Sequence, residues 1–131
     1  WAQTQRTEMI EKYFLQIELI IQEFPNIRSL SLTKKIYNAK QGFISGSIMF
    51  ENGFGLDFVE VKNTDVKSKI KYRYQYMNEK SEMVFRYDNA PHHSDIKTFP
   101  HHKHETDGVR ASDEPSLSDV MTEIARNHRK L

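Results

Sequence analysis

The chain has 131 residues, of which 37% are hydrophobic and 28% are charged, and its formal net charge is +1. It contains no cysteine, which excludes a disulfide framework, a thiolate nucleophile and a sulfur-ligated zinc site, so any site chemistry uses nitrogen and oxygen atoms. The length and the short apolar runs predict a single cytoplasmic domain over residues 1–131. Because the chain begins at Trp1, we also expect a short segment before it.

An amphipathic helix is predicted from Thr4 to Phe24. Its apolar residues recur at the three-and-four spacing that places them on one helix face: Met9, Ile10, Tyr13, Phe14, Ile17, Ile20, Ile21 and Phe24. Pro25 ends the helix, because the residue before a proline is pushed out of the α region.

An alternation with a period of two replaces the helical spacing after Arg28 and predicts β-strands. The predicted strands are Arg28–Tyr37, Phe43–Phe50, Gly55–Lys62, Lys67–Tyr76 and Ser81–Tyr87. Turn residues such as Asn52-Gly53 separate consecutive strands, so we expect neighbours in the chain to pair antiparallel.

The fourth predicted strand has one aromatic and one basic face. The cations Lys69, Lys71 and Arg73 are candidate RNA-binding residues, because a row of cations can follow a phosphate backbone. If the hairpin turns at Asn78-Glu79, Lys71 lies opposite Arg86 and Arg73 lies opposite Val84. The like charges of Lys71 and Arg86 would then favour an anion bound between them. The alternative is an ordinary solvated face, partly neutralised by Glu60 and Glu82.

Residues 88–114 show little apolar periodicity and are predicted to form a long ordered loop, a feature that is uncommon unless it is functional. Pro115-Ser116 then opens a last helix, with Ser116 as its cap and Asp119 three residues later. His128 is expected at an exposed helix end. The predicted fold class is α+β: an N-terminal helix, an antiparallel twisted sheet of about four or five strands, a long histidine-rich loop and a C-terminal helix.

Five of the six histidines lie between His92 and His104, a density that calls for a chemical reason. A neutral and a protonated imidazole can act as base and acid across a phosphodiester, and RNA supplies its own nucleophile in the 2′-hydroxyl, so no cofactor is needed. The candidate catalytic residues are Arg86, His92, His93, His101, His102, Lys103 and His104, with the two cations stabilising the phosphorane and Asp88 and Asn89 in support.

A metal site is the second interpretation of the same segment. His102 and His104 would project to one side of an extended chain, and His92 or Asp88 could complete a nitrogen and oxygen shell for zinc, nickel or manganese. For Asp88 and Asn89 a purely structural role, capping a turn before Pro91, also remains open.

Three strings in this region resemble the hallmark of the TumE family of small bacterial and archaeal toxins. They are Phe85-Arg86-Tyr87-Asp88-Asn89-Ala90-Pro91-His92-His93, Thr98-Phe99-Pro100-His101-His102-Lys103-His104 and Asp107-Gly108-Val109. The resemblance implies a toxin of a type II toxin–antitoxin module, neutralised by a helix-turn-helix antitoxin. By analogy of size and element order alone, it also implies a layout like that of RelE/ParE toxins.

The leading hypothesis is therefore a toxin that cleaves RNA as a metal-independent endoribonuclease, with an antitoxin and RNA as partners. The alternatives are a metal-dependent nuclease or nucleotide-modifying toxin that uses the same histidines, and a non-enzymatic protein-binding module.

Overall fold

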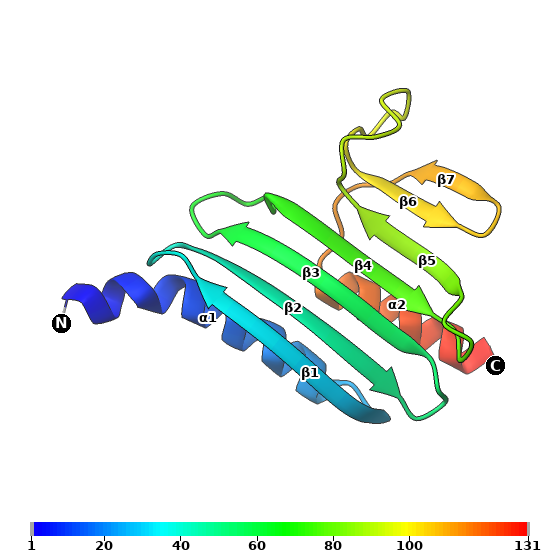
Figure 1. The fold of residues 1–131 in the computed structure, drawn as a ribbon, viewed down its shortest axis with the longest axis horizontal. Coiled ribbons are helices and arrows are strands. Elements are labelled where there is room, and N and C mark those ends of the chain that lie inside the picture. The colour runs from blue at the N-terminus through cyan, green and yellow to red at the C-terminus, as the bar shows by residue number, and fades with distance from the viewer. Residues whose placement is uncertain (1, 131) are drawn as a thin grey trace.

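A computed structural model describes the backbone of residues 2–130 and the side chains of residues 9–128. The elements are α1 (Ala2–Glu23), β1 (Ile27–Ile36), β2 (Gln41–Phe50), β3 (Gly55–Asn63), β4 (Lys71–Met77), β5 (Met83–Asp88), β6 (His102–Glu105), β7 (Gly108–Ala111) and α2 (Leu117–Lys130). The strands form one antiparallel sheet in chain order, from β1 to β7 (Figure 1). Within residues 2–130, no helix is long and apolar enough to cross a membrane.

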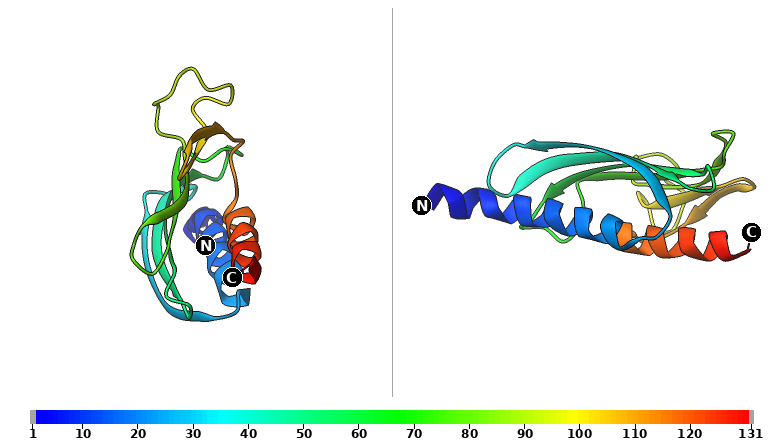
Figure 2. Two further views of the ribbon diagram at one scale, coloured as in Figure 1. Left: turned by 90° about the vertical axis from the view of Figure 1, so that its right-hand side faces the viewer. Right: turned by 90° about the horizontal axis from the view of Figure 1, so that it is seen from below.

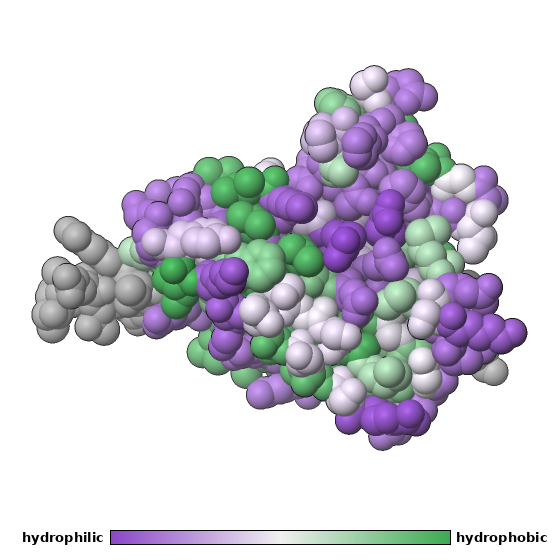
Figure 3. Space-filling model, viewed as in Figure 1, coloured by the Kyte–Doolittle hydropathy of each residue, from purple (hydrophilic) through white to green (hydrophobic). Residues whose placement is uncertain are grey.

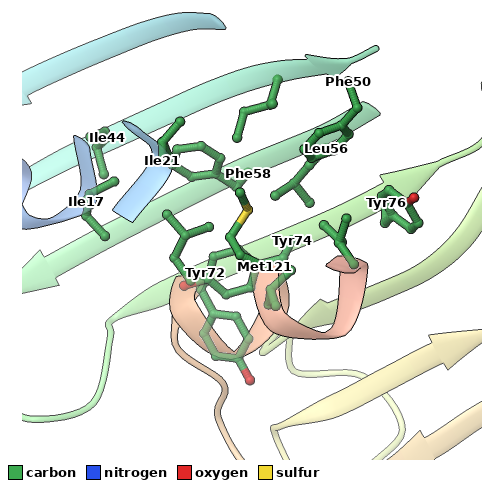
Figure 4. Packing of buried hydrophobic residues seen from close by; sticks show 14 of the residues in the cluster. Ile17, Ile21, Ile44, Phe50, Leu56, Phe58, Tyr72, Tyr74, Tyr76 and Met121 are labelled. Carbon is green, nitrogen blue, oxygen red and sulfur yellow. The ribbon is translucent and has the colours of Figure 1, made fainter. Parts of the chain in front are cut away.

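Both helices lie on one side of the sheet, and the other side, which we call the open face, carries no layer (Figure 2). The core fills the space between helices and sheet, to which α1 contributes Ile17, α2 Met121 and β4 Tyr74 (Figure 4). Gly42 on β2 allows the close approach of α1, because a Cβ there would lie 2.8 Å from the Phe14 ring. The α+β class with its terminal helices is confirmed.

Both helix boundaries follow from local signals. The first helix ends at Glu23, before Pro25, as predicted. At the start of α2, the Ser116 hydroxyl accepts the backbone N–H of Asp119 at 3.1 Å, and the Asp119 carboxylate accepts the backbone N–H of Ser116 at 2.9 Å. This reciprocal pair is the expected capping box.

The sheet has more strands than predicted, because the expected loop contains the β6–β7 hairpin. β6 pairs with β5 and places His104 opposite Arg86. The two strands are short and polar, so no apolar alternation marks them. The dipeptide Asp107-Gly108 at their turn was the available signal, since Gly108 has a φ of 141° that other residues disfavour.

The predicted register between β4 and β5 is wrong by four residues. Arg73 lies opposite Asp88 and Gln75 opposite Arg86, so the expected pairing of cations does not occur. The connection is longer than the predicted turn because the side-chain oxygen Oδ1 of Asn78 accepts the backbone N–H groups of residues 80 and 82, at 2.9 Å and 3.0 Å. A shift of an even number of residues keeps Arg86 on the open face.

The predicted basic face loses Lys69, because β4 starts only at Lys71. Lys69 is buried on the helix side, where its Nζ donates to the Pro115 carbonyl at 2.7 Å. Glu60 does not neutralise the open face either, since it is buried and accepts the hydroxyl of Tyr74 at 2.6 Å. Lys71 and Arg73 remain exposed on the open face.

His128 is half-buried, which contradicts its predicted exposure. Its Nε2 accepts the Tyr76 hydroxyl at 2.7 Å, and its ring lies edge-on to Phe50 with 5.2 Å between the ring centroids. Burial lowers the pKa of His128, which favours the neutral ring that this acceptor role requires. His128 therefore joins α2 to the sheet.

Candidate active site

Alternate residues of β5 and β6 place a cluster of polar side chains on the open face. Arg86 and Asp88 lie opposite His104 and His102, and the loop before β6 adds His93. The ring centroids are 4.8 Å apart for His102 and His104, 5.3 Å for His93 and His102, and 5.8 Å for His93 and His104. We call these five residues the histidine cluster.

The buried carboxylate of Asp88 is the centre of the cluster. Its Oδ2 accepts the Arg86 Nε–H at 3.0 Å, and its Oδ1 lies 2.8 Å from His102 Nε2. Oδ1 also accepts the backbone N–H of Ala90 at 3.0 Å, which fixes the chain as it leaves β5. These contacts hold a carboxylate that is only 6% exposed.

His102 is buried, and both of its ring nitrogens have partners within the chain. It is 2% exposed, and its Nδ1 donates to the Pro100 carbonyl at 2.9 Å. Its Nε2 lies 2.8 Å from Oδ1 of the Asp88 carboxylate, so both ring nitrogens contact groups of the chain. His102 therefore orients the Asp88 carboxylate and forms the buried base of the cluster.

His104 carries an accepting nitrogen. Its Nε2 lies 3.2 Å from Arg86 Nη2 and 3.5 Å from Asp88 Oδ2. A guanidinium can only donate, so in the neutral ring Nε2 is placed to accept from Arg86, the nearer of the two groups. Burial and the Arg86 charge lower the pKa of His104, so the ring is neutral at neutral pH. A neutral imidazole next to a cation can serve as a base.

His93 is the exposed histidine of the cluster. It sits in the left-handed region with a φ of 59°, in the loop between β5 and β6. Its ring lies close to those of His102 and His104, and its side chain makes no hydrogen bond within residues 9–128. His93 is therefore open to a ligand that enters from the solvent side.

Three predicted site residues lie elsewhere. His92 is exposed and stands outside the ring contacts of the cluster. His101 stacks on Tyr72 on the helix side, where its Nδ1 lies 2.9 Å from the Tyr72 hydroxyl. Lys103 also faces the helices, because alternation along β6 turns it away from its neighbours 102 and 104.

The contacts of Lys103 are those of a structural residue. Its Nζ lies 2.7 Å from Glu123 and 3.0 Å from Glu105, and it covers the Tyr87 ring at 5.0 Å from the centroid. Burial alone would lower the pKa of Lys103, but hydrogen bonds to the two carboxylates outweigh it and raise the pKa above the ordinary value. A lysine held in this way does not reach the histidine cluster.

The side chain of Asn89 also contacts the backbone of the sheet. Its side-chain oxygen accepts the backbone N–H of Tyr72 at 3.0 Å, and its nitrogen donates to the Ile70 carbonyl at 3.2 Å. These two bonds continue the β4–β5 pairing beyond the last residue of β5, and so hold Asp88 in place.

Metal binding is geometrically possible in the cluster. One donor atom from each of Asp88, His102 and His104 lies within 4.8 Å of the others. A histidine that donates its second nitrogen to a carbonyl, as His102 does, is common among metal ligands. However, the Arg86 guanidinium contacts both Asp88 and His104, so a fixed positive charge lies where the ion would bind. His92, the fourth predicted ligand, stays outside the group.

A family model described as Toxin TumE matches residues 17–128. The chain belongs to the TumE toxin family. The match spans β1 to β7 and the whole histidine cluster, so the resemblance seen in the sequence is confirmed. TumE membership gives the protein a toxin role and suggests an antitoxin partner. No curated protein and no solved structure matches the chain significantly.

Proposed function

We propose that this TumE-family toxin is a metal-independent endoribonuclease in which His104 is the base and His93 the acid. The observation that carries the proposal is the pairing of two unlike histidines, one neutral beside Arg86 and one exposed, with ring centroids 5.8 Å apart. Two imidazoles placed on one surface can serve the entering and the leaving oxygen of one phosphodiester.

The proposed step needs no further reactant. His104 Nε2 takes the proton of the 2′-hydroxyl as the O2′–P bond forms, and protonated His93 gives a proton to O5′ as the P–O5′ bond breaks. The products are a 2′,3′-cyclic phosphate and a 5′-hydroxyl, and exchange with water restores both histidines. The Arg86 side chain is 34% exposed, so its guanidinium can turn from His104 Nε2 to a phosphate oxygen, where it stabilises the phosphorane.

Asp88 and His102 act as positioning residues in this proposal. Asp88 holds the Arg86 guanidinium at 3.0 Å, and His102 fixes the second oxygen of the same carboxylate at 2.8 Å. A substrate meets neither of them directly, since both are buried.

Incubation of the purified chain with total RNA, with and without a strong chelator, tests the proposal. We expect cleavage that survives the chelator and is lost in His104→Gln. The variant His92→Gln is the matched control, because it replaces a neighbouring exposed histidine that lies outside the cluster. Intact activity in His104→Gln, with its folding verified, would refute the assignment of the base.

A metal-dependent nuclease is the second candidate, favoured by the donor geometry of Asp88, His102 and His104. Replacement of Arg86 distinguishes the metal-dependent from the metal-independent mechanism. If a cation is required, Arg86→Ala removes a competing charge and tightens zinc or manganese binding while cleavage persists. If the histidines work alone, Arg86→Ala slows cleavage about a hundredfold, as loss of one stabilising group does in other enzymes.

For the partner, we propose a helix-turn-helix antitoxin of a type II module that neutralises the toxin by covering the open face. Family membership supports an antitoxin in general, and the position of the histidine cluster on the open face supports this location. Similarity to the RelE/ParE layout stays a prediction. A pull-down with the product of the neighbouring gene, followed by protection of residues 86–104 from hydrogen exchange, tests the contact.

A further inference from the structure

The histidine cluster is one end of two rows that cross the open face from β6 to β1. The register places Ser45, Val59 and Arg73 in line with Asp88 and His102. The neighbouring row continues from His104 and Arg86 through Gln75 to Asp57, Ser47 and Ser31. Adjacent strands are about 4.8 Å apart, so the rows span about 24 Å.

An open hollow of about 370 Å³ lies on β1–β4 at the far part of these rows. Its polar lining consists of the hydroxyls of Ser31, Thr33, Ser45 and Ser47, the Asp57 carboxylate and the Arg73 guanidinium. Figure 3 looks onto this face, where strongly hydrophilic side chains gather toward β5–β7. Arg73 lines the hollow and also lies opposite Asp88, so it connects the hollow to the cluster.

The polar groups of the hollow are available to a ligand. Among the described side chains, those of Ser47, Asp57 and Arg73 make no hydrogen bond or ion pair within the molecule, and the same is true of Lys71. By contrast, Lys69 and Lys103 on the helix side are both paired with carboxylates. The fold therefore pairs Lys69 and Lys103 on the helix side and leaves Lys71 and Arg73 free on the open face.

The charge of the open face suits an anion. Its strand positions on β1–β6 carry four cations, Lys35, Lys71, Arg73 and Arg86, and two carboxylates, Asp57 and Asp88. Asp88 is already bound by Arg86 and His102. Asp57 is the carboxylate of this surface that has no partner among the described residues, and such a carboxylate can recognise the amino group of a base.

We infer that the open face of β1–β4 is a subsite for single-stranded nucleic acid, in which Arg73 binds a backbone phosphate and Asp57 selects a base that bears an amino group. The inference rests on the proposed function, because it places an RNA strand across the sheet with one phosphodiester at the histidine cluster. The hydroxyls of Ser45 and Ser47 supply further contacts to base or ribose. A hollow of this size is within the range of small-ligand sites.

The test is the binding of fluorescein-labelled (dC)6 and (dT)6 to the full chain, measured by anisotropy. Both oligonucleotides lack the 2′-hydroxyl that the proposed cleavage requires, and only cytosine presents an amino group. We expect wild type to prefer (dC)6 about tenfold, since a hydrogen bond to a charged group contributes about 1.5 kcal/mol. Asp57→Val removes the preference without weakening (dT)6, a pattern that partial unfolding would not produce.

Arg73→Ala is expected to weaken both oligonucleotides about tenfold, while Lys80→Ala, an exposed cation at the hairpin tip, leaves binding unchanged. Equal affinity of wild type for the two sequences, or an Arg73→Ala variant that binds as wild type does, overturns the inference. If neither oligonucleotide binds, the inferred subsite is also overturned, and a protein becomes the expected occupant of the open face. RNA cleavage is scored separately: cutting without these binding effects refutes only the subsite, and these binding effects without cutting refute only the nuclease.

Discussion

Replacement of Lys103 by Met separates a structural from a catalytic role for the one cation of the histidine-rich strand. The residue lies between His102 and His104 in the sequence, yet its Nζ contacts Glu123 at 2.7 Å and Glu105 at 3.0 Å on the opposite side of the sheet. Met keeps the apolar stem over the Phe85 and Tyr87 rings and removes only the charge.

The structure sets the expected cost in stability. Exposed ion pairs contribute under about 1 kcal/mol, and removing one partner of a fully buried pair costs about 3–5 kcal/mol. Lys103 is 17% exposed and Glu123 27%, and the Tyr87 hydroxyl still donates to Glu123 in the variant. The pair therefore falls between these limits, at about 2 kcal/mol, which lowers the Tm of a domain of this size by about 8 °C.

The assay combines thermal unfolding with RNA cleavage well below the Tm. We expect Lys103→Met to lose stability while its cleavage rate stays within about twofold of wild type. Lys97→Met, at an exposed loop position, is the control for loss of a lysine and should change neither quantity. A Lys103→Met chain that is as stable as wild type but cannot cut RNA would refute the placement of Lys103 outside the site.

Three further predictions concern ionisation. Because the pKa of His104 is lowered and the base must be neutral, cleavage should rise with pH through a value below about 6.5. It should fall again at higher pH, because the acid His93 must carry its proton, and single-turnover pH profiles measure both limbs. In Arg86→Ala the cleavage rate that remains should rise at a higher pH than in wild type, because the guanidinium charge is one cause of the low pKa of His104. If the rise stays at the same pH, it belongs to a group other than His104. The contribution of His128 to stability is complete above about pH 6.5 and is lost as the pH falls, since the folded state holds its pKa below the unfolded value. Between pH 8 and 5, the Tm of His128→Gln should therefore fall less than the Tm of wild type. An equal fall in Tm for the two chains would contradict the role of the Tyr76 contact.

The predictable part of the fold is the part with long, regular apolar spacing. The first helix and five strands follow from periods that persist over many residues. Pro25 marks the end of the first helix, and the Ser116 cap marks the start of the second. The β6–β7 hairpin has strands of four residues each and a polar sequence, so only Asp107-Gly108 pointed to it. The β4–β5 register depends on hydrogen bonds of Asn78, which residue spacing does not encode.

Composition predicts which residues are candidates for the site, but not how they are arranged. Histidine density located the region, but recognising β6 as a strand was necessary to see that His102 and His104 face one way and Lys103 the other. His93 joins the cluster from a loop, which no periodicity predicts. The sequence does not predict the hydroxyl-lined hollow, because residues such as Ser45 and Ser47 are common on any exposed strand face.

The most direct measurement of the central claim is the chemistry of the cut ends. A defined RNA oligonucleotide is treated with the purified chain in the presence of chelator, and a second oligonucleotide carries a 2′-deoxy nucleotide at the cut position. If His104 and His93 work without metal, the products end in a 2′,3′-cyclic phosphate and a 5′-hydroxyl, and the deoxy substrate stays intact. Cleavage that needs an added divalent ion, or that cuts the deoxy substrate and leaves a 5′-phosphate, would contradict the account.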